Sequence, residues 1–164
     1  MDHIWSPWRY QFLTEGVPKE GCIFCRMAAD EPSRDEQNLI AYRADKNFVV
    51  LNLYPYTSGH MMIVPYEHVS ELSAAETATA AEMMELTRVA ERALRKDYHP
   101  DGINLGMNLG AAAGAGIAQH IHMHVLPRWI GDANFISTIG ETRNLPEELH
   151  VTWRKLRAAF LLLR

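Results

Sequence analysis

The chain has 164 residues, of which 48% are hydrophobic and 22% charged, and its formal net charge is −4. These values are typical of a globular protein and exclude disordered and fibrous classes; the length predicts one domain over residues 1–164. Without a cluster of Lys and Arg we expect no nucleic-acid polymer as a partner, although a small nucleotide can bind. The chain has no apolar run of membrane-spanning length and its polar start does not resemble a signal peptide, so we expect a cytoplasmic protein without a membrane partner.

In chain order, the sequence predicts an arm, a short helix and five strands. Residues 1–20 mix aromatic side chains with Pro and Gly and predict an extended arm, and residues 26–37 predict a short helix followed by a loop. Three strand candidates bounded by turn residues come next: Leu39–Arg43, Phe48–Leu51 and His60–Pro65. Two further candidates flank a run of Gly and Ala: Ile103–Asn108 and His120–Leu126.

Two amphipathic helices complete the predicted fold. The first starts at Ser73, which forms a capping box with Glu76, and runs to about Lys96. Its predicted buried face consists of Ala80, Met83, Met84, Leu86 and Ala90. The second covers residues 146–164, begins near Pro146 and carries an apolar stripe of Leu149, Trp153, Leu156 and Phe160. Strands close in sequence with one long helix between them predict an α+β fold on a mainly antiparallel sheet.

Three histidines alternate with apolar residues at the start of the last predicted strand: His120, His122 and His124. Because successive side chains of a strand point to opposite faces, the three imidazoles are expected to share one face. A solvated strand face, a three-histidine metal site and a nucleophilic site are all compatible with this pattern.

The segment before the histidines, residues 108–118, contains three glycines and few bulky side chains. Small residues let backbone N–H groups approach phosphate oxygens closely, as in an anion nest. Beside three histidines, this segment favours phosphate chemistry over a metal site alone.

The only two cysteines, Cys22 and Cys25, form a Cys-x-x-Cys pair. In a reducing compartment this spacing favours a metal or redox pair over a structural disulfide. A closed tetrahedral zinc site needs two further ligands, and two buried thiols without a metal are the alternative.

The stretch "HIHMHVL" resembles the histidine-triad signature, in which three histidines alternate with apolar residues, and every position fits. The segments "CIFC", "NLYPYTSGHMMIVPYEHVSEL" and "HIHMHVLPRWIGDANF" are similar to the corresponding parts of bacterial histidine-triad proteins. The segments "WSPWRYQF" and "PRWIGDANF" resemble the branch of diadenosine polyphosphate phosphorylases and hydrolases. The resemblance implies a single histidine-triad domain that cleaves a nucleotide at its α-phosphate through a nucleotidyl-histidine intermediate.

The same resemblance assigns roles to individual residues. It makes His122 the nucleophile, His124 a ligand of the α-phosphate oxygens and His120 the residue that maintains the geometry. His60 matches the upstream histidine that backs the triad, and Asn52 matches the position that binds the ribose hydroxyls. A neutral imidazole can attack phosphorus only if its other nitrogen keeps the proton, and a neighbouring acceptor fixes that tautomer.

The loop before the triad departs from the family pattern. Many relatives have Ser or Gln there, and this chain has Ala115, Gly116 and Ile117. More of the phosphate binding then falls to backbone amides. The expected substrate ligands in this region are Asn108, Gly114, Gly116 and Gln119, although Asn108 can equally serve as a strand-end turn.

The resemblance also implies a structural zinc ion. Some histidine-triad proteins complete such a site with a histidine after the central strand and with the first triad histidine. The implied ligands are Cys22, Cys25, His68 and His120.

The acceptor of the nucleotidyl group, water or phosphate, is left open by the sequence. An adenosine phosphoramidase-like hydrolase and a catalytically silent nucleotide-binding module are the alternatives to a diadenosine polyphosphate enzyme. Relatives of this type are homodimers, so we expect a homodimer. Its apolar surface is expected from the first long helix, the tryptophans of the arm and the stripe of the last helix, unless the core of the domain absorbs them.

Overall fold

The computed structural model describes residues 21–132, 139 and 145–163, so the predicted arm over residues 1–20 lies outside the described part. Its helices are α2 (Ile23–Ala29), α3 (Thr77–Tyr98) and α5 (Leu149–Leu163), with short 3-10 helices η1 (Pro32–Arg34), η2 (Leu72–Ala74) and η3 (Ala111–Ala113). Its strands are β1 (Ile40–Arg43), β2 (Asn47–Leu51), β3 (Met61–Pro65), β4 (Gly102–Gly106) and β5 (Met123–Arg128). The predicted α+β class is confirmed. Within the described ranges, no helix has the length and apolar character needed to span a membrane.

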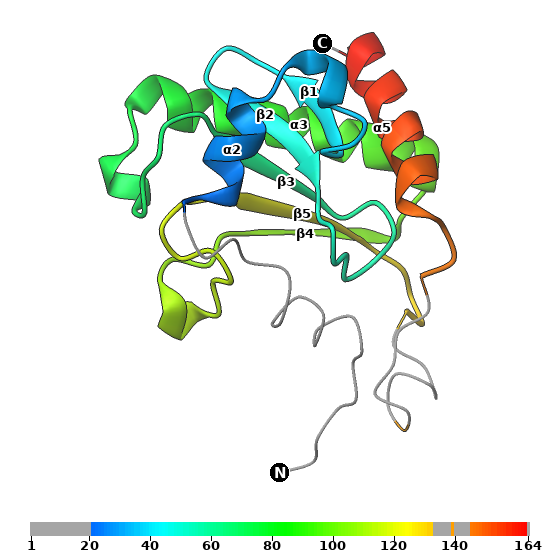
Figure 1. Cartoon of the computed structure of the whole chain (residues 1–164). Coiled ribbons are helices and arrows are strands. Elements are labelled where there is room, and N and C mark those ends of the chain that lie inside the picture. The colour runs from blue at the N-terminus through cyan, green and yellow to red at the C-terminus, as the bar shows by residue number, and fades with distance from the viewer. Residues whose placement is uncertain (1–20, 133–138, 140–144, 164) are drawn as a thin grey trace.

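The five strands form one antiparallel sheet in the order β1-β2-β3-β5-β4 (Figure 1). Val50 of β2 pairs with Met62 of β3, and Met62 pairs in turn with His124 of β5. These three residues therefore lie in one row across the sheet and share a face. The neighbouring row, Val49, Ile63 and Met123, belongs to the opposite face.

The two long helices build the core against the sheet. Helix α3 packs against β2, β3 and β5, and α5 packs against α3 and β1; Figure 1 shows α3 behind the sheet. The buried helix residues include Met83, Leu86 and Ala90 of α3 and Trp153, Leu156 and Phe160 of α5. Nε1 of Trp153 also donates a hydrogen bond to the carbonyl of Ile40 at 2.9 Å, so α5 covers the β1 end of the sheet.

The capping box predicted at Ser73 does not form. Ser73 lies in η2, Ala75 has an extended backbone, and α3 begins at Thr77 with Glu76 as its N-cap. The Glu76 carboxylate pairs with Lys46 at 3.3 Å instead of returning to Ser73. Met84 was expected on the buried face of the helix, but it is 52% exposed because it lies about 100° from Met83 around the helix.

The starts of α5 and β5 also differ from the prediction, and the short helix expected from residue 26 begins at Ile23. Helix α5 begins at Leu149, and Glu147 precedes it with its carboxylate accepting hydrogen bonds from Tyr98 and Thr152. Strand β5 begins at Met123, three residues later than expected. The backbone N–H of Ile121 donates to the carbonyl of Val69, in the loop after β3, so residues 120–122 follow that loop and not a neighbouring strand.

A tight loop joins β2 to β3 and leads directly into His60. The N–H of Asn52 donates to the carbonyl of His60 at 3.1 Å, and the N–H of His60 donates to that of Thr57 at 3.2 Å. Gly59 has a φ of +87°, and a Cβ at this position would lie 3.0 Å from Leu94 Cδ2 and 3.3 Å from Pro127 Cγ. The turn before His60 therefore requires glycine both for its backbone conformation and for space.

We expect Gly59→Ala to lower the free energy of unfolding by about 1–3 kcal/mol, because alanine is strained at positive φ and contacts Leu94. Gly131→Ala is the matched control: Gly131 has a φ of +85° but nothing within 4 Å of the added Cβ. Urea denaturation of both variants measures the difference. Equal destabilisation of the two proteins would show that packing against Leu94 and Pro127 contributes nothing.

Candidate functional site

A cavity of about 310 Å³ opens over the face of the sheet that carries Val50, Met62 and His124. Helix α2 supplies part of its wall through Ile23, Phe24 and Met27. Further lining comes from the segment before β5, with Asn108, Gly114, Gly116, Ile117 and His122. The sheet register thus brings one triad histidine to the cavity from β5, and the preceding segment contributes a second.

His122 lines the cavity, and one of its ring nitrogens is held by a hydrogen bond. Its Nδ1 is 2.9 Å from the carbonyl oxygen of His120, which can only accept, so Nδ1 carries the proton. In the neutral ring the lone pair is therefore on Nε2. Burial lowers the pKa of His122, with the hydrogen bond to His120 acting in the opposite direction, and the Phe24 ring packs 5.1 Å from the imidazole. The ring is a neutral imidazole with a defined tautomer.

His60 and His124 form a pair of hydrogen-bonded imidazoles. Nε2 of His60 is 2.9 Å from Nδ1 of His124, and the Tyr56 ring lies beside both. Burial, followed by the proximity of His124 and His122, lowers the pKa of His60 to about 3. Burial, followed by the proximity of His122, lowers the pKa of His124 to about 4. Both rings are thus neutral near pH 7.

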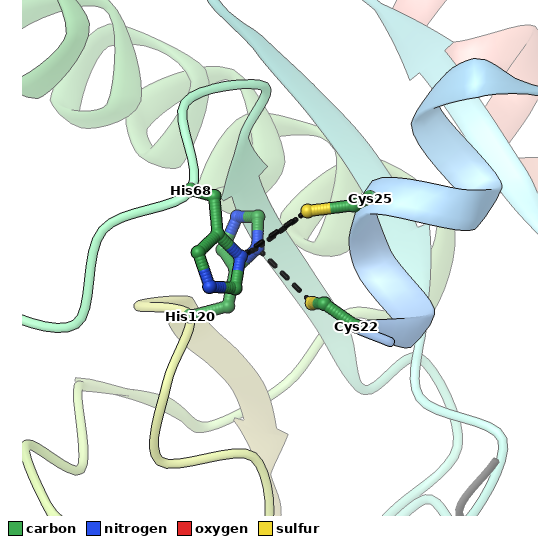
Figure 2. Close-up of side chains that lie close together, drawn as sticks. All are labelled: Cys22, Cys25, His68 and His120. Carbon is green, nitrogen blue, oxygen red and sulfur yellow. Dashed lines mark hydrogen bonds between the residues drawn. The ribbon is translucent and has the colours of Figure 1, made fainter. Parts of the chain in front are cut away.

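A separate cluster includes the first triad histidine, where Cys22, Cys25, His68 and His120 converge (Figure 2). Their four ligand atoms all lie within 4.8 Å of one another. The two cysteines come from the start of α2, His68 from the loop after β3, and His120 from the segment before β5. Three segments far apart in the sequence therefore meet at this cluster.

The spacing of the two imidazoles and Cys25 is close to that of a tetrahedral zinc site. Zinc bond lengths place two nitrogen ligands about 3.3 Å apart and a sulfur and a nitrogen about 3.6 Å apart. The two Nδ1 atoms of His68 and His120 are 3.2 Å apart, and Cys25 Sγ lies 3.2 Å and 3.6 Å from them. Nε2 of His120 donates to the carbonyl of Pro65 at 2.9 Å, which leaves the Nδ1 lone pair directed at the cluster. The donor set and its geometry fit Zn²⁺.

The residues expected to bind substrate fall into two groups. Four of them line the cavity: Asn52, Asn108, Gly114 and Gly116. Gln119 is exposed and is not among the lining residues. In the glycine-rich loop, the N–H groups of Ala113, Gly114 and Ala115 donate to carbonyls of Gly110 and Ala111 within the η3 turn. Those three amides are occupied by the turn itself, so this part of the loop does not form an open anion nest.

The apolar and aromatic lining of the cavity did not emerge from the sequence. It includes Ile23, Phe24, Met27, Leu39, Tyr54, Tyr56 and Met62. The segment "CIFC" contains a usable signal. Its two middle residues lie between cysteines that are held at one site, so their position beside the triad could have been predicted. The tyrosines of "NLYPYTSGH" flank the turn that positions His60 and could have been assigned by their proximity in sequence.

Comparisons with known proteins agree with this geometry. A family model for the HIT domain matches residues 33–129. The chain is 40% identical over 161 residues to an AP-4-A phosphorylase of Mycobacterium tuberculosis, covering 95% of this chain and 83% of that protein. A crystal structure of a zinc-bound histidine triad family protein from Mycobacterium smegmatis superposes with a TM-score of 0.70 at 32% identity, covering 87% and 95% of the two chains.

A second solved structure is similar over a smaller region. A member of the HIT family from Bacillus subtilis superposes with a TM-score of 0.59 at 29% identity, covering 67% of this chain and 74% of that one. The family model spans more than half of the chain, and the curated relative covers nearly all of it. The chain belongs to the histidine-triad (HIT) family.

Proposed function

We propose that this protein is a diadenosine polyphosphate phosphorylase in which His122 forms a covalent nucleotidyl intermediate. One observation carries the proposal: a buried, neutral imidazole lines a cavity while its Nδ1 proton is held by the His120 carbonyl. This arrangement leaves one nitrogen lone pair for attack, as nucleophilic catalysis by histidine requires. The similarity to an AP-4-A phosphorylase supports the choice of substrate class and acceptor.

In the first step, the Nε2 lone pair of His122 attacks the α-phosphorus and a P–N bond forms. The bond from phosphorus to the bridging oxygen breaks, and its electron pair leaves with the polyphosphate. An oxygen of inorganic phosphate then attacks the same phosphorus, the P–N bond breaks, and His122 recovers its lone pair. With diadenosine tetraphosphate the products are ATP and ADP.

Other residues of the cavity support binding in this scheme. His124 lies in the cavity floor and contacts the His122 ring, with their centroids 4.8 Å apart, so it is placed to bind the α-phosphate oxygens. Asn52 and Asn108 offer amides for the ribose and the phosphates. The apolar wall of α2 offers Phe24 and its neighbours to a nucleobase.

We expect diadenosine tetraphosphate and inorganic phosphate to yield ATP and ADP in equal amounts, with one enzyme-bound nucleotidyl group formed before phosphate is added. Chromatography of the products with and without phosphate measures this. Continuous release of AMP in the absence of phosphate would overturn the phosphorylase assignment in favour of a hydrolase. Absence of any cleavage under both conditions would exclude an enzyme that acts on diadenosine tetraphosphate.

The same assay tests the nucleophile. His122→Asn should lower kcat by at least about a thousandfold while the Kd for substrate changes little, because the bond-forming lone pair is lost and the cavity stays intact. His150→Gln, an exposed histidine of α5, is the control and should retain full activity. Turnover of the His122 variant within about tenfold of the unmodified protein would exclude a covalent role.

We infer that the Cys22–Cys25–His68–His120 cluster holds one structural zinc ion. The donor types, their spacing and the orientation of His120 support this, as does similarity to a zinc-bound member of the family. When bound, the metal would cross-link α2 to the segments that flank β3 and β5. Its ligand His120 lies two residues before His122 in the chain, so the metal would affect catalysis by positioning that segment.

Protein purified without chelator should contain one zinc per chain by elemental analysis. Cys22→Ser should lose that zinc and melt at a lower temperature, because metal binding to a folded site contributes directly to folding free energy. His99→Asn changes an exposed histidine outside the cluster and should retain the metal. Metal-free wild-type protein, or a Cys22→Ser protein with full zinc content, would contradict the assignment.

We propose that the protein is a homodimer joined through β4. Much of the helix surface expected to form the interface is instead buried in the core of one chain: Met83 and Leu86 of the long helix, and Trp153, Leu156 and Phe160 of the last helix. Strand β4 is the last in the described sheet order, and its Leu105 is 50% exposed. An edge strand with exposed apolar side chains is a ready surface for pairing with a second copy.

Light scattering at low micromolar concentration should return about twice the chain mass of 18.6 kDa. Leu105→Lys should lower this mass towards the monomer, because a lysine on an edge strand opposes pairing. Leu162→Lys, at an exposed position of α5, is the control and should leave the mass unchanged. A mass of 18.6 kDa for the unmodified protein would refute the dimer.

A further inference from the structure

Asn52 and His60 lie side by side where the loop between β2 and β3 closes. The register of the two strands ends at Leu51 and Met61, and the Asn52 N–H continues it by donating to the His60 carbonyl at 3.1 Å. Their side chains also meet, with Nδ2 of Asn52 3.3 Å from Nδ1 of His60. A residue eight positions before the histidine is thereby brought into direct contact with its ring.

The orientation of the Asn52 amide is fixed by a third residue. The backbone N–H of Tyr54 donates to Oδ1 of Asn52 at 3.0 Å, and of the two amide atoms only the oxygen can accept a hydrogen bond. The NH₂ group of Asn52 therefore faces His60. An amide NH₂ can only donate, so Nδ1 of His60 must be the acceptor.

A second donor points at the same nitrogen. The backbone N–H of Tyr56 donates to Nδ1 of His60 at 3.2 Å. A neutral His60 with an unprotonated Nδ1 carries its proton on Nε2, which is 2.9 Å from Nδ1 of His124. His124 then accepts through Nδ1 and carries its own proton on Nε2. The two donors at His60 therefore determine which atom donates and which accepts in the His60–His124 hydrogen bond.

We propose that Asn52 is a positioning residue for nucleotidyl transfer, whose amide fixes the tautomers of His60 and His124 so that His124 presents an N–H to a substrate phosphate oxygen. The proposal rests on the proposed function for the role of His124 in the reaction. It adds a second task to a residue otherwise expected to bind ribose. The two tasks are compatible, because one N–H of the amide and one lone pair of Oδ1 remain for a hydroxyl group.

The chemistry of the amide distinguishes Asn52 from a carboxylate of the same shape. An aspartate at this position could only accept, and it would favour a proton on Nδ1 of His60. The adjacent negative charge would also stabilise the protonated ring and so raise the pKa of His60. The other groups that face His60 are the His124 and His122 imidazoles, which oppose that charge, and the Tyr56 ring.

Nitrogen-15 NMR of the histidine side chains in the ligand-free protein tests the tautomers without any enzymatic assay. We expect wild-type His60 and His124 each to carry a single proton, on Nε2, near neutral pH. A proton on Nδ1 of His60 in the wild-type protein would overturn the proposal at once. This measurement needs no variant, so it holds even if substitutions at position 52 impair folding.

The variant Asn52→Asp then tests the role of the amide itself. It should raise the pKa of His60 by about one to three pH units, as a carboxylate in contact with an imidazole does. Asn108→Asp places the same charge in the same cavity and should leave the titration of His60 nearly unchanged. An unchanged His60 in Asn52→Asp, or an equal rise in both variants, would overturn the proposal. Turnover of diadenosine tetraphosphate is measured separately, so a failure of the proposed function appears as inactivity with the tautomers intact.

Discussion

The structure around the cavity depends on one constraint: each of four imidazoles, three buried and one half-buried, has a ring nitrogen held by a hydrogen bond to a fixed partner. His120 donates to Pro65, His122 donates to the carbonyl of His120, and His60 and His124 bond to each other. Burial lowers the pKa of all four rings, so each is a neutral group with one donor and one acceptor nitrogen. Fixing one nitrogen of a neutral ring therefore defines the chemistry available at the other.

Helix α2 joins the candidate metal site to the cavity. It has only seven residues, too few to be stable alone, so its position depends on what holds its two ends. Its start carries the cysteines of the cluster. At its other end, the Arg43 guanidinium donates to the carbonyls of Met27 and Ala28 and pairs with Asp35 at 2.9 Å. Between these anchors, Phe24 packs 5.4 Å from the His120 ring and 5.1 Å from the His122 ring.

The sequence predicted the elements better than their ends. All five strands and both long helices were predicted from turn residues, helix-start signals and the apolar faces of the helices, which are local features. The start at Ser73 was wrong: Ser73 lies in η2, Glu76 is the N-cap of α3, and its carboxylate contacts the distant Lys46. The start of β5 was wrong because Ile121 pairs with the loop after β3. Such long-range partners leave no trace in the local pattern.

The candidate site was predictable to a similar degree. Alternation of the histidines and the resemblance to a known family named the residues that meet at the cavity and at the cluster. The apolar wall was missed because it depends on which row of the sheet faces α2. The contact of Asn52 with His60 was likewise hidden, because it arises from the register at which the loop closes. Spacing of eight residues carries no such information by itself.

The neutrality of the rings bears on how this cavity would handle a polyphosphate. Among the described residues that line it, none is Lys or Arg, so phosphate binding falls to N–H donors such as His124. An approaching anion raises the pKa of a nearby imidazole, and a protonated His122 would have no lone pair for attack. Because burial starts the pKa of His124 at about 4 and lowers that of His122, both rings can stay neutral beside the charge. In the proposed reaction, burial thus opposes the protonation of His122 that the negative charge of the substrate would favour.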